Sequence, residues 1–239
     1  MTRPAARADL AGLPVEVAPQ LLGALLETVV AGERVVVRLT EVEAYHGRGT
    51  GEVPDPGSHA RMGPTARNAT MWGEPGHLYV YLSHGIHSCV NIVCGPEGVA
   101  GGVLLRGGEI VEGADIAERR RLERRGAVRS ARDLARGPGR LGDAVGLRHP
   151  IHDGIDAVTG AERAGARARL LLAETPVSRI ATGPRVGVAG LAGTDAFPWR
   201  FWIEGDATVS PFRWGRGAAE AAARQDDPSA GSGQASRPC

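Results

Sequence analysis

The chain has 239 residues, 42% of them hydrophobic, and a formal net charge of +1, so it suits one large domain or two small ones and is not a polycation. All 28 of its basic residues are arginine, which excludes mechanisms that need a lysine nucleophile or a P-loop lysine. It has no apolar stretch as long as a membrane span, no signal-peptide pattern and only three cysteines, which predicts a cytoplasmic protein without a membrane partner.

The first predicted elements lead to a strand that ends in acidic residues. Residues 1–13 are expected to form a flexible arm, and residues 20–27 a short amphipathic helix. The β-branched run at 35–37 predicts a strand, along which one face would carry Val35, Val37, Leu39, Glu41, Glu43 and Tyr45. This pattern fits a strand that runs from the core into a pocket. It also fits a strand that leaves the core with both glutamates solvated.

The rest of the chain predicts further strands and two helices. Residues 46–77 are expected to be mostly loop, and strands are expected at 78–82, 89–94 and 102–106, paired antiparallel because their connections are short. Helices are expected over 112–135 and from 140, and later strands at 168–173, 185–188 and 200–203. We predict a single α+β domain over residues 14–214, with a curved, mostly antiparallel sheet and surrounding helices, and a disordered tail over 215–239.

Two groups of side chains suggest chemistry. The first group could hold a flat polar ring. Aromatic side chains stack on such a ring, an amide contacts its edge, and a carboxylate can take part in a reaction on it. The members of this group are Glu43, His59, Tyr79, Tyr81, Asn91 and Arg106. The second is a face of arginines at helical spacing, which would contact phosphate or be merely solvated; its members are Arg125, Arg129, Arg132 and Arg136.

At these residues the sequence resembles the alkyladenine (3-methyladenine) DNA glycosylase family of the mammalian type, which also occurs in bacteria. The resemblance runs from about residue 13 to 211. Its matching segments are 40–45, 58–61, 67–68, 78–81, 91–93, 104–106 and 137–141, in the family's order and close to its spacing. It implies a monofunctional enzyme that flips out alkylated or deaminated purines and hydrolyses their N-glycosidic bond, leaving an abasic site without lyase activity. No cofactor is implied, and the partner would be double-stranded DNA with damaged purines, bound by a monomer at the nucleoid.

The resemblance also implies residue roles. Glu43 would be the general base that activates water, and Arg106 would position that water. Tyr45, His59 and Tyr81 would form the walls around the base, and Asn91 would reject guanine by crowding its exocyclic amine. The DNA contacts would come from Arg61, Arg67, His84, His87 and Arg140. Two residues depart from the family pattern: His84 replaces a tyrosine that wedges into the DNA stack, and Arg140 replaces a lysine.

Three other interpretations remain open from the residues alone. One is a nucleic-acid-binding module in which Glu43 is structural. Another is a carbohydrate hydrolase, because Glu41 and Glu43 would lie about 7 Å apart on a strand, close to the separation of paired catalytic carboxylates. The third is a zinc site, because five of the seven histidines lie between His46 and His87, beside Cys89 and Cys94. No second matching cysteine pair is present, so we expect no metal.

Overall fold

The computed structural model describes residues 1–47, 54–125 and 128–225. Its strands are β1 (Thr2–Pro4), β2 (Leu25–Val30), β3 (Glu33–His46), β4 (His77–Ser83), β5 (His87–Val93), β6 (Gly101–Glu112), β7 (Ala135–Arg136), β8 (Ile155–Asp156), β9 (Ala166–Ala173), β10 (Ile180–Gly183) and β11 (Arg200–Ile203). Its α-helices are α1 (Pro14–Val17), α2 (Ala114–Arg125), α3 (Pro138–Val145) and α4 (Ala218–Gln225). Short 3-10 turns occupy Arg7–Leu10, Ala18–Leu21, Ala69–Trp72, Ala131–Asp133 and Gly190–Gly193. Within these ranges, no helix is long and apolar enough to cross a membrane.

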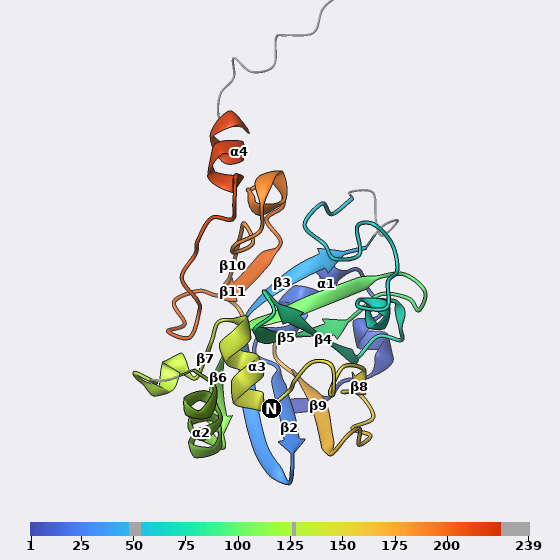
Figure 1. Cartoon of the computed structure of the whole chain (residues 1–239), viewed down its shortest axis with the longest axis vertical. Coiled ribbons are helices and arrows are strands. Elements are labelled where there is room, and N and C mark those ends of the chain that lie inside the picture. Colours follow the sequence, from blue (N-terminus) through green and yellow to red (C-terminus); the bar gives the residue numbers. More distant parts are fainter. Residues whose placement is uncertain (48–53, 126–127, 226–239) are drawn as a thin grey trace, which may run out of the picture.

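The strands form one curled sheet, which confirms the predicted α+β fold. Its order is β1-β9-β2-β3-β6-β5-β4-β8, and every pair recorded in the described ranges is antiparallel. The long strand β3 is central: its first half pairs with β2, its second half pairs with β11, and its other edge pairs with β6. Figure 1 shows α2 and α3 beside β6 and β7, and α4 at the far end of the molecule from β2.

Strand β3 changes its buried face part of the way along, which the alternating pattern did not predict. Its register against β6 shifts between Leu39 and Glu41 and again between Glu41 and Val42. Core residues are odd-numbered up to Leu39, whereas Val42 and Ala44 fill the core beyond the shift. A bulge inserts an extra residue and so reverses which side chains face the core. The prediction of one shared face for residues 35–45 is therefore wrong, and the bulge turns Glu43 away from the main core.

Both predicted ends of the chain differ from the structure. Residues 1–13 do not form a free arm, because β1 pairs with β9 and Leu10 is buried in the core. The predicted helix over 20–27 is replaced by a 3-10 turn that ends at Leu21 and by strand β2, which pairs on both edges. In the predicted disordered tail, residues 218–225 form α4 with Ala218 buried, and residues 226–239 lie outside the described residues.

The predicted arginine helix is also shorter than expected. Strand β6 continues to Glu112, α2 ends at Arg125, and residues 131–136 form a 3-10 turn and β7. Arg129, Arg132 and Arg136 therefore do not share a face of one helix. The strands predicted at 168–173 and 200–203 are confirmed, whereas 185–188 is irregular and β10 lies just before it.

Candidate active site

A cavity of about 1260 Å³ lies where β3, β4, β5 and β6 meet the turn before α3. Its floor and walls include every residue that the sequence predicted for catalysis or base binding: Glu43, Tyr45, His59, Tyr81, Asn91 and Arg106. Two later segments, residues 186–189 and 210–213, close its remaining side. The cavity therefore brings together side chains that are far apart in the sequence.

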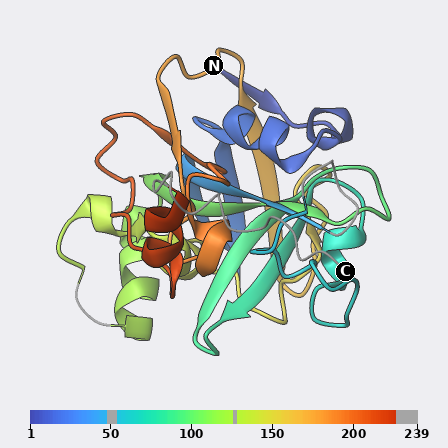
Figure 2. The same ribbon diagram turned by 90° about the horizontal axis from the view of Figure 1, so that it is seen from above.

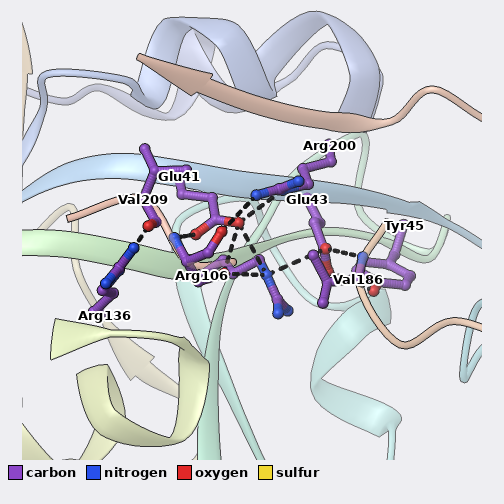
Figure 3. A network of polar contacts seen from close by, with 9 residues as sticks. Glu41, Glu43, Tyr45, Arg106, Arg136, Val186, Arg200 and Val209 are labelled. Carbon is purple, nitrogen blue, oxygen red and sulfur yellow. Dashed lines mark hydrogen bonds and ion pairs between the residues drawn. The ribbon is translucent and has the colours of Figure 1, made fainter. Parts of the chain in front are cut away.

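Glu43 lines this cavity and is fully buried (0% exposed). The Tyr45 hydroxyl donates a hydrogen bond of 2.8 Å to Oε2, and the Val186 backbone N–H donates one of 2.7 Å to Oε1. Burial, together with the negative charge of Glu43, raises the pKa of Tyr45 well above its usual value, so its phenol stays a donor. These donors hold the carboxylate in one orientation at the cavity wall (Figure 3).

Arg106 is the cation beside this carboxylate. Its Nε lies 3.5 Å from Oε1 of Glu43 and 3.0 Å from Oε1 of Glu41, and donates a hydrogen bond of 3.2 Å to the Ser210 hydroxyl. Burial alone would lower the pKa of Arg106, but the two glutamates outweigh it and the net shift is upward. Arg106 therefore remains charged in the cavity wall.

An aromatic wall stands on the β4 side of the cavity. The His59 ring meets the Tyr81 ring edge to face at 4.6 Å, and Tyr79 stacks on Tyr81 at 5.5 Å between ring centroids. Burial lowers the pKa of His59, and the positive charges of Arg67 and Arg61 lower it further, so the imidazole is neutral at pH 7. A neutral, flat wall can stack on an uncharged or a cationic ring.

Tyr45, which also lines the cavity, rests on a residue that the sequence analysis missed. Arg185 is fully buried, and its guanidinium lies 4.5 Å from the Tyr45 ring centroid. It binds Asp55 through two hydrogen bonds of 2.7 Å and donates to the Ala44 carbonyl at 3.0 Å. The signal that could have identified it is a lone arginine in the apolar, glycine-rich stretch 181–193.

Asn91 reaches the cavity from β5. Its Nδ2 donates a hydrogen bond of 3.0 Å to the Tyr79 carbonyl, and the residue is almost completely buried. This bond fixes the side-chain amide beside the aromatic wall.

The predicted DNA contacts fall into two groups. Arg61, His84, His87 and Arg140 all line the outer part of the cavity, together with Arg129 and Arg136. Arg67 does not line it: this residue is exposed, and its Nη2 donates a hydrogen bond of 2.9 Å to the Leu82 carbonyl of the β4–β5 hairpin. The rim is therefore rich in arginine, as expected for a surface that meets phosphates.

His84 occupies the turn of that hairpin and is exposed. Its backbone φ is +50°, in the left-handed region that few residues other than glycine adopt. Figure 2 shows the hairpin, in blue-green, projecting beyond the body of the sheet. The exposed His84 therefore lies in the hairpin turn and also lines the cavity.

The competing interpretations of the carboxylates and histidines gain no support from this geometry. Glu41 does not line the cavity, and both of its oxygens are occupied by protein donors, so Glu41 and Glu43 are not a pair presented to one substrate. In the described ranges, no three His, Cys, Asp or Glu side chains come together as a metal-binding group.

Sequence comparison finds the same resemblance over most of the chain. The profile of the methylpurine-DNA glycosylase family matches residues 9–207. A protein of Leifsonia xyli subsp. xyli, named as a candidate 3-methyladenine DNA glycosylase, is 51% identical over 83% of this chain and 88% of its own length. Proteins with the same name from Streptomyces avermitilis and Nocardia farcinica are each 47% identical, over 83% and 84% of this chain and 87% of their own length.

Proposed function

Because the chain belongs to the methylpurine-DNA glycosylase family, we propose that it is a repair enzyme that releases alkylated or deaminated purines of the 3-methyladenine type from double-stranded DNA. The observation that carries this proposal is Glu43, a buried carboxylate oriented by two hydrogen-bond donors at the wall of an aromatic cavity. A damaged base would enter this cavity by rotating out of the duplex.

The reaction is a hydrolysis at the sugar carbon. A water molecule beside Glu43 gives a proton to the carboxylate while its oxygen bonds to C1′ of the flipped nucleotide. The bond between C1′ and the purine N9 breaks, and its electron pair leaves with the base. Arg106, next to Glu43, orients the water and the carboxylate. The products are a free base and an abasic site, and the absence of lysine agrees with the absence of a Schiff-base lyase step.

The cavity walls suit the purine. Tyr45 would stack on one face of the ring, and His59 and Tyr81 would contact the other. Asn91, fixed by its bond to the Tyr79 carbonyl, would crowd the exocyclic amine of guanine, which adenine-type lesions lack at that position. Alkylated purines carry positive charge and leave easily, so one general base and a fitted cavity suffice for them.

The rim would bind the duplex around the lesion. Arg61, Arg140 and His87 line the cavity and would contact phosphates, and His84 at the hairpin turn would occupy the space left by the flipped nucleotide. Arg67 would act indirectly, by supporting the hairpin through Leu82. One chain supplies all of these groups, so we propose that the protein acts as a monomer on the DNA of the nucleoid.

The test is the variant Glu43→Gln. We expect it to lower the release of 3-methyladenine from alkylated duplex DNA by about 100- to 10,000-fold, the range for loss of a general base. Binding to a duplex with an abasic-site analogue should stay within about twofold, because Glu43 contacts the water rather than the DNA backbone.

The matched control is Glu109→Gln, which removes an exposed carboxylate paired with Arg38. Unchanged base release in Glu43→Gln would refute the assigned role, and a wild-type protein that releases no base would leave only a binding function.

A further inference from the structure

Glu41 is a buried carboxylate beside the cavity whose two oxygens both accept hydrogen bonds from the protein, although it does not line the cavity. Its Oε1 accepts from Arg200 Nε at 2.7 Å and from the Ser210 hydroxyl at 2.9 Å, and lies 3.0 Å from Arg106 Nε. Its Oε2 accepts from the Ser210 backbone N–H at 2.7 Å. The side chain is fully buried. Figure 3 shows Arg106 of β6 and Arg200 of β11 meeting Glu41 of β3.

We propose that Glu41 is a positioning residue for base release, which fixes Arg106 through Nε so that its guanidinium stays beside Glu43. This inference rests on the proposed function, in which Glu43 is the general base. Glu41 has no oxygen left for a substrate and does not line the cavity, so it acts through Arg106.

The contacts of Arg106 show how the positioning works. All its hydrogen bonds and ion pairs recorded in the described ranges run through Nε, to Glu41, Glu43 and the Ser210 hydroxyl. A guanidinium carries its five N–H donors in a rigid, planar fork. Fixing Nε therefore also fixes the direction of the two terminal nitrogens, in a residue that forms part of the cavity wall.

A glycine in β6 leaves room for the Glu41 carboxylate. Gly107 lies opposite Glu41 in the ladder between β3 and β6, at the bulge. A Cβ on Gly107 would approach Oε2 of Glu41 and the Thr208 carbonyl to 3.1 Å each. A larger residue would thus push the carboxylate away from the Ser210 backbone N–H.

Arg200 completes the charge balance of the buried group. Its Nη2 donates to the Ser210 carbonyl at 2.9 Å, and its guanidinium lies 4.5 Å from the Trp202 ring centroid. Arg200 and Arg106 together offset the charges of Glu41 and Glu43 where water is excluded. Without Glu41, Arg106 would keep the Ser210 hydroxyl and Glu43 as partners and could turn toward Glu43, taking up the carboxylate that the reaction needs.

The experiment measures the single-turnover rate of base release from alkylated duplex DNA in four proteins: wild type, Glu41→Gln, Arg106→Ala and the double variant. We expect Glu41→Gln to lower the rate about 100-fold, the effect of displacing a catalytic group by about 1 Å. In the Arg106→Ala background, the same substitution should change the rate by less than about twofold, because its effect passes through Arg106. Affinity for a duplex with an abasic-site analogue should stay within about twofold in all four.

Two outcomes overturn the inference while leaving the proposed function intact. One is an unchanged rate of base release in Glu41→Gln. The other is a double variant whose loss of rate equals the product of the two single losses, as expected for two independent defects. A wild-type protein without base release overturns both. If circular dichroism shows that Glu41→Gln does not fold, Ser210→Ala takes its place, because it removes the hydroxyl between Arg106 and Glu41. We then expect a loss of about fivefold, the effect of one hydrogen bond, which Arg106→Ala again abolishes.

Discussion

At the scale of single residues, the cavity depends on a buried ion pair behind its wall. Arg185 and Asp55 are both almost fully excluded from solvent and share two hydrogen bonds of 2.7 Å. The guanidinium also lies against Tyr45 and Trp199, at 4.5 and 5.1 Å from their ring centroids. The pair therefore holds the stacking face of Tyr45 at a fixed position.

We predict that Asp55→Asn destabilises the protein by about 3–5 kcal/mol, because it leaves the Arg185 charge buried without its counter-ion. The measurement is the free energy of unfolding in urea. The matched control is Glu204→Gln, whose carboxylate pairs with Arg179 at the surface; it should cost less than about 1 kcal/mol. An equal effect of the two substitutions would mean that burial of the Arg185 pair adds nothing.

At the scale of elements, the β4–β5 hairpin carries residues proposed for base recognition and for duplex distortion. Tyr79 and Tyr81 alternate along β4 toward the cavity, Asn91 faces it from β5, and His84 occupies the turn between these strands. Arg67 supports the hairpin from outside through the Leu82 carbonyl. One rigid hairpin can therefore hold a flipped base near its middle and fill the gap in the duplex with its tip.

From this arrangement we predict that His84→Ala weakens binding to an abasic-site duplex by about tenfold, the loss of one stacking contact with a base. Binding to single-stranded DNA of the same length should change less, because no stack has to be opened. The matched control is Ile86→Ala, which truncates another exposed side chain of the same turn. Equal losses in duplex and single strand would contradict a wedge at His84.

At the scale of the whole molecule, a chain with a net charge of +1 presents a local positive rim. Five arginines line the cavity, Arg61, Arg129, Arg136, Arg140 and Arg213, in addition to the buried Arg106 and Arg121. Elsewhere most arginines that bridge elements are paired with carboxylates, as Arg34, Arg38 and Arg7 are. The cavity lining thus holds more arginines than carboxylates, although Arg140 pairs with Asp133 at 3.5 Å, and we expect a positive local potential there.

The affinity for duplex DNA falls as salt rises, and a plot of log affinity against log salt concentration has a slope set by the number of phosphate contacts. We predict that the double variant Arg129→Ala/Arg140→Ala makes this slope shallower by about 1.8, or about 0.9 per lost phosphate contact. The control, Arg167→Ala/Arg169→Ala, removes the same charge from exposed positions on β9 outside the cavity and should leave the slope unchanged. Titration of duplex binding at several salt concentrations distinguishes the two. Equal slopes in both variants would show that the rim does not contact phosphate.

Much of the architecture and most of the candidate site could be predicted from local sequence. β-branched and alternating runs indicate strands β3, β4, β5 and β6, since side chains alternate across a pleated strand, and short connections favour antiparallel pairing. The residue types at 43, 59, 81, 91 and 106 suit a base-binding slot, the family resemblance adds Tyr45, and the structure places all six around one cavity. Their assigned roles stay predictions.

Only the tertiary structure decided which way these side chains point and what supports them. The bulge in β3 depends on pairing with β6, so no pattern within residues 35–45 could show that Glu43 faces away from the main core. Likewise, β2 is a strand rather than a helix because it has a neighbour on each edge. The contacts of Glu43 with Val186, and of Glu41 with Ser210, join residues more than 140 positions apart. Local sequence determines conformational preference, whereas such contacts exist only once the chain has closed around its core.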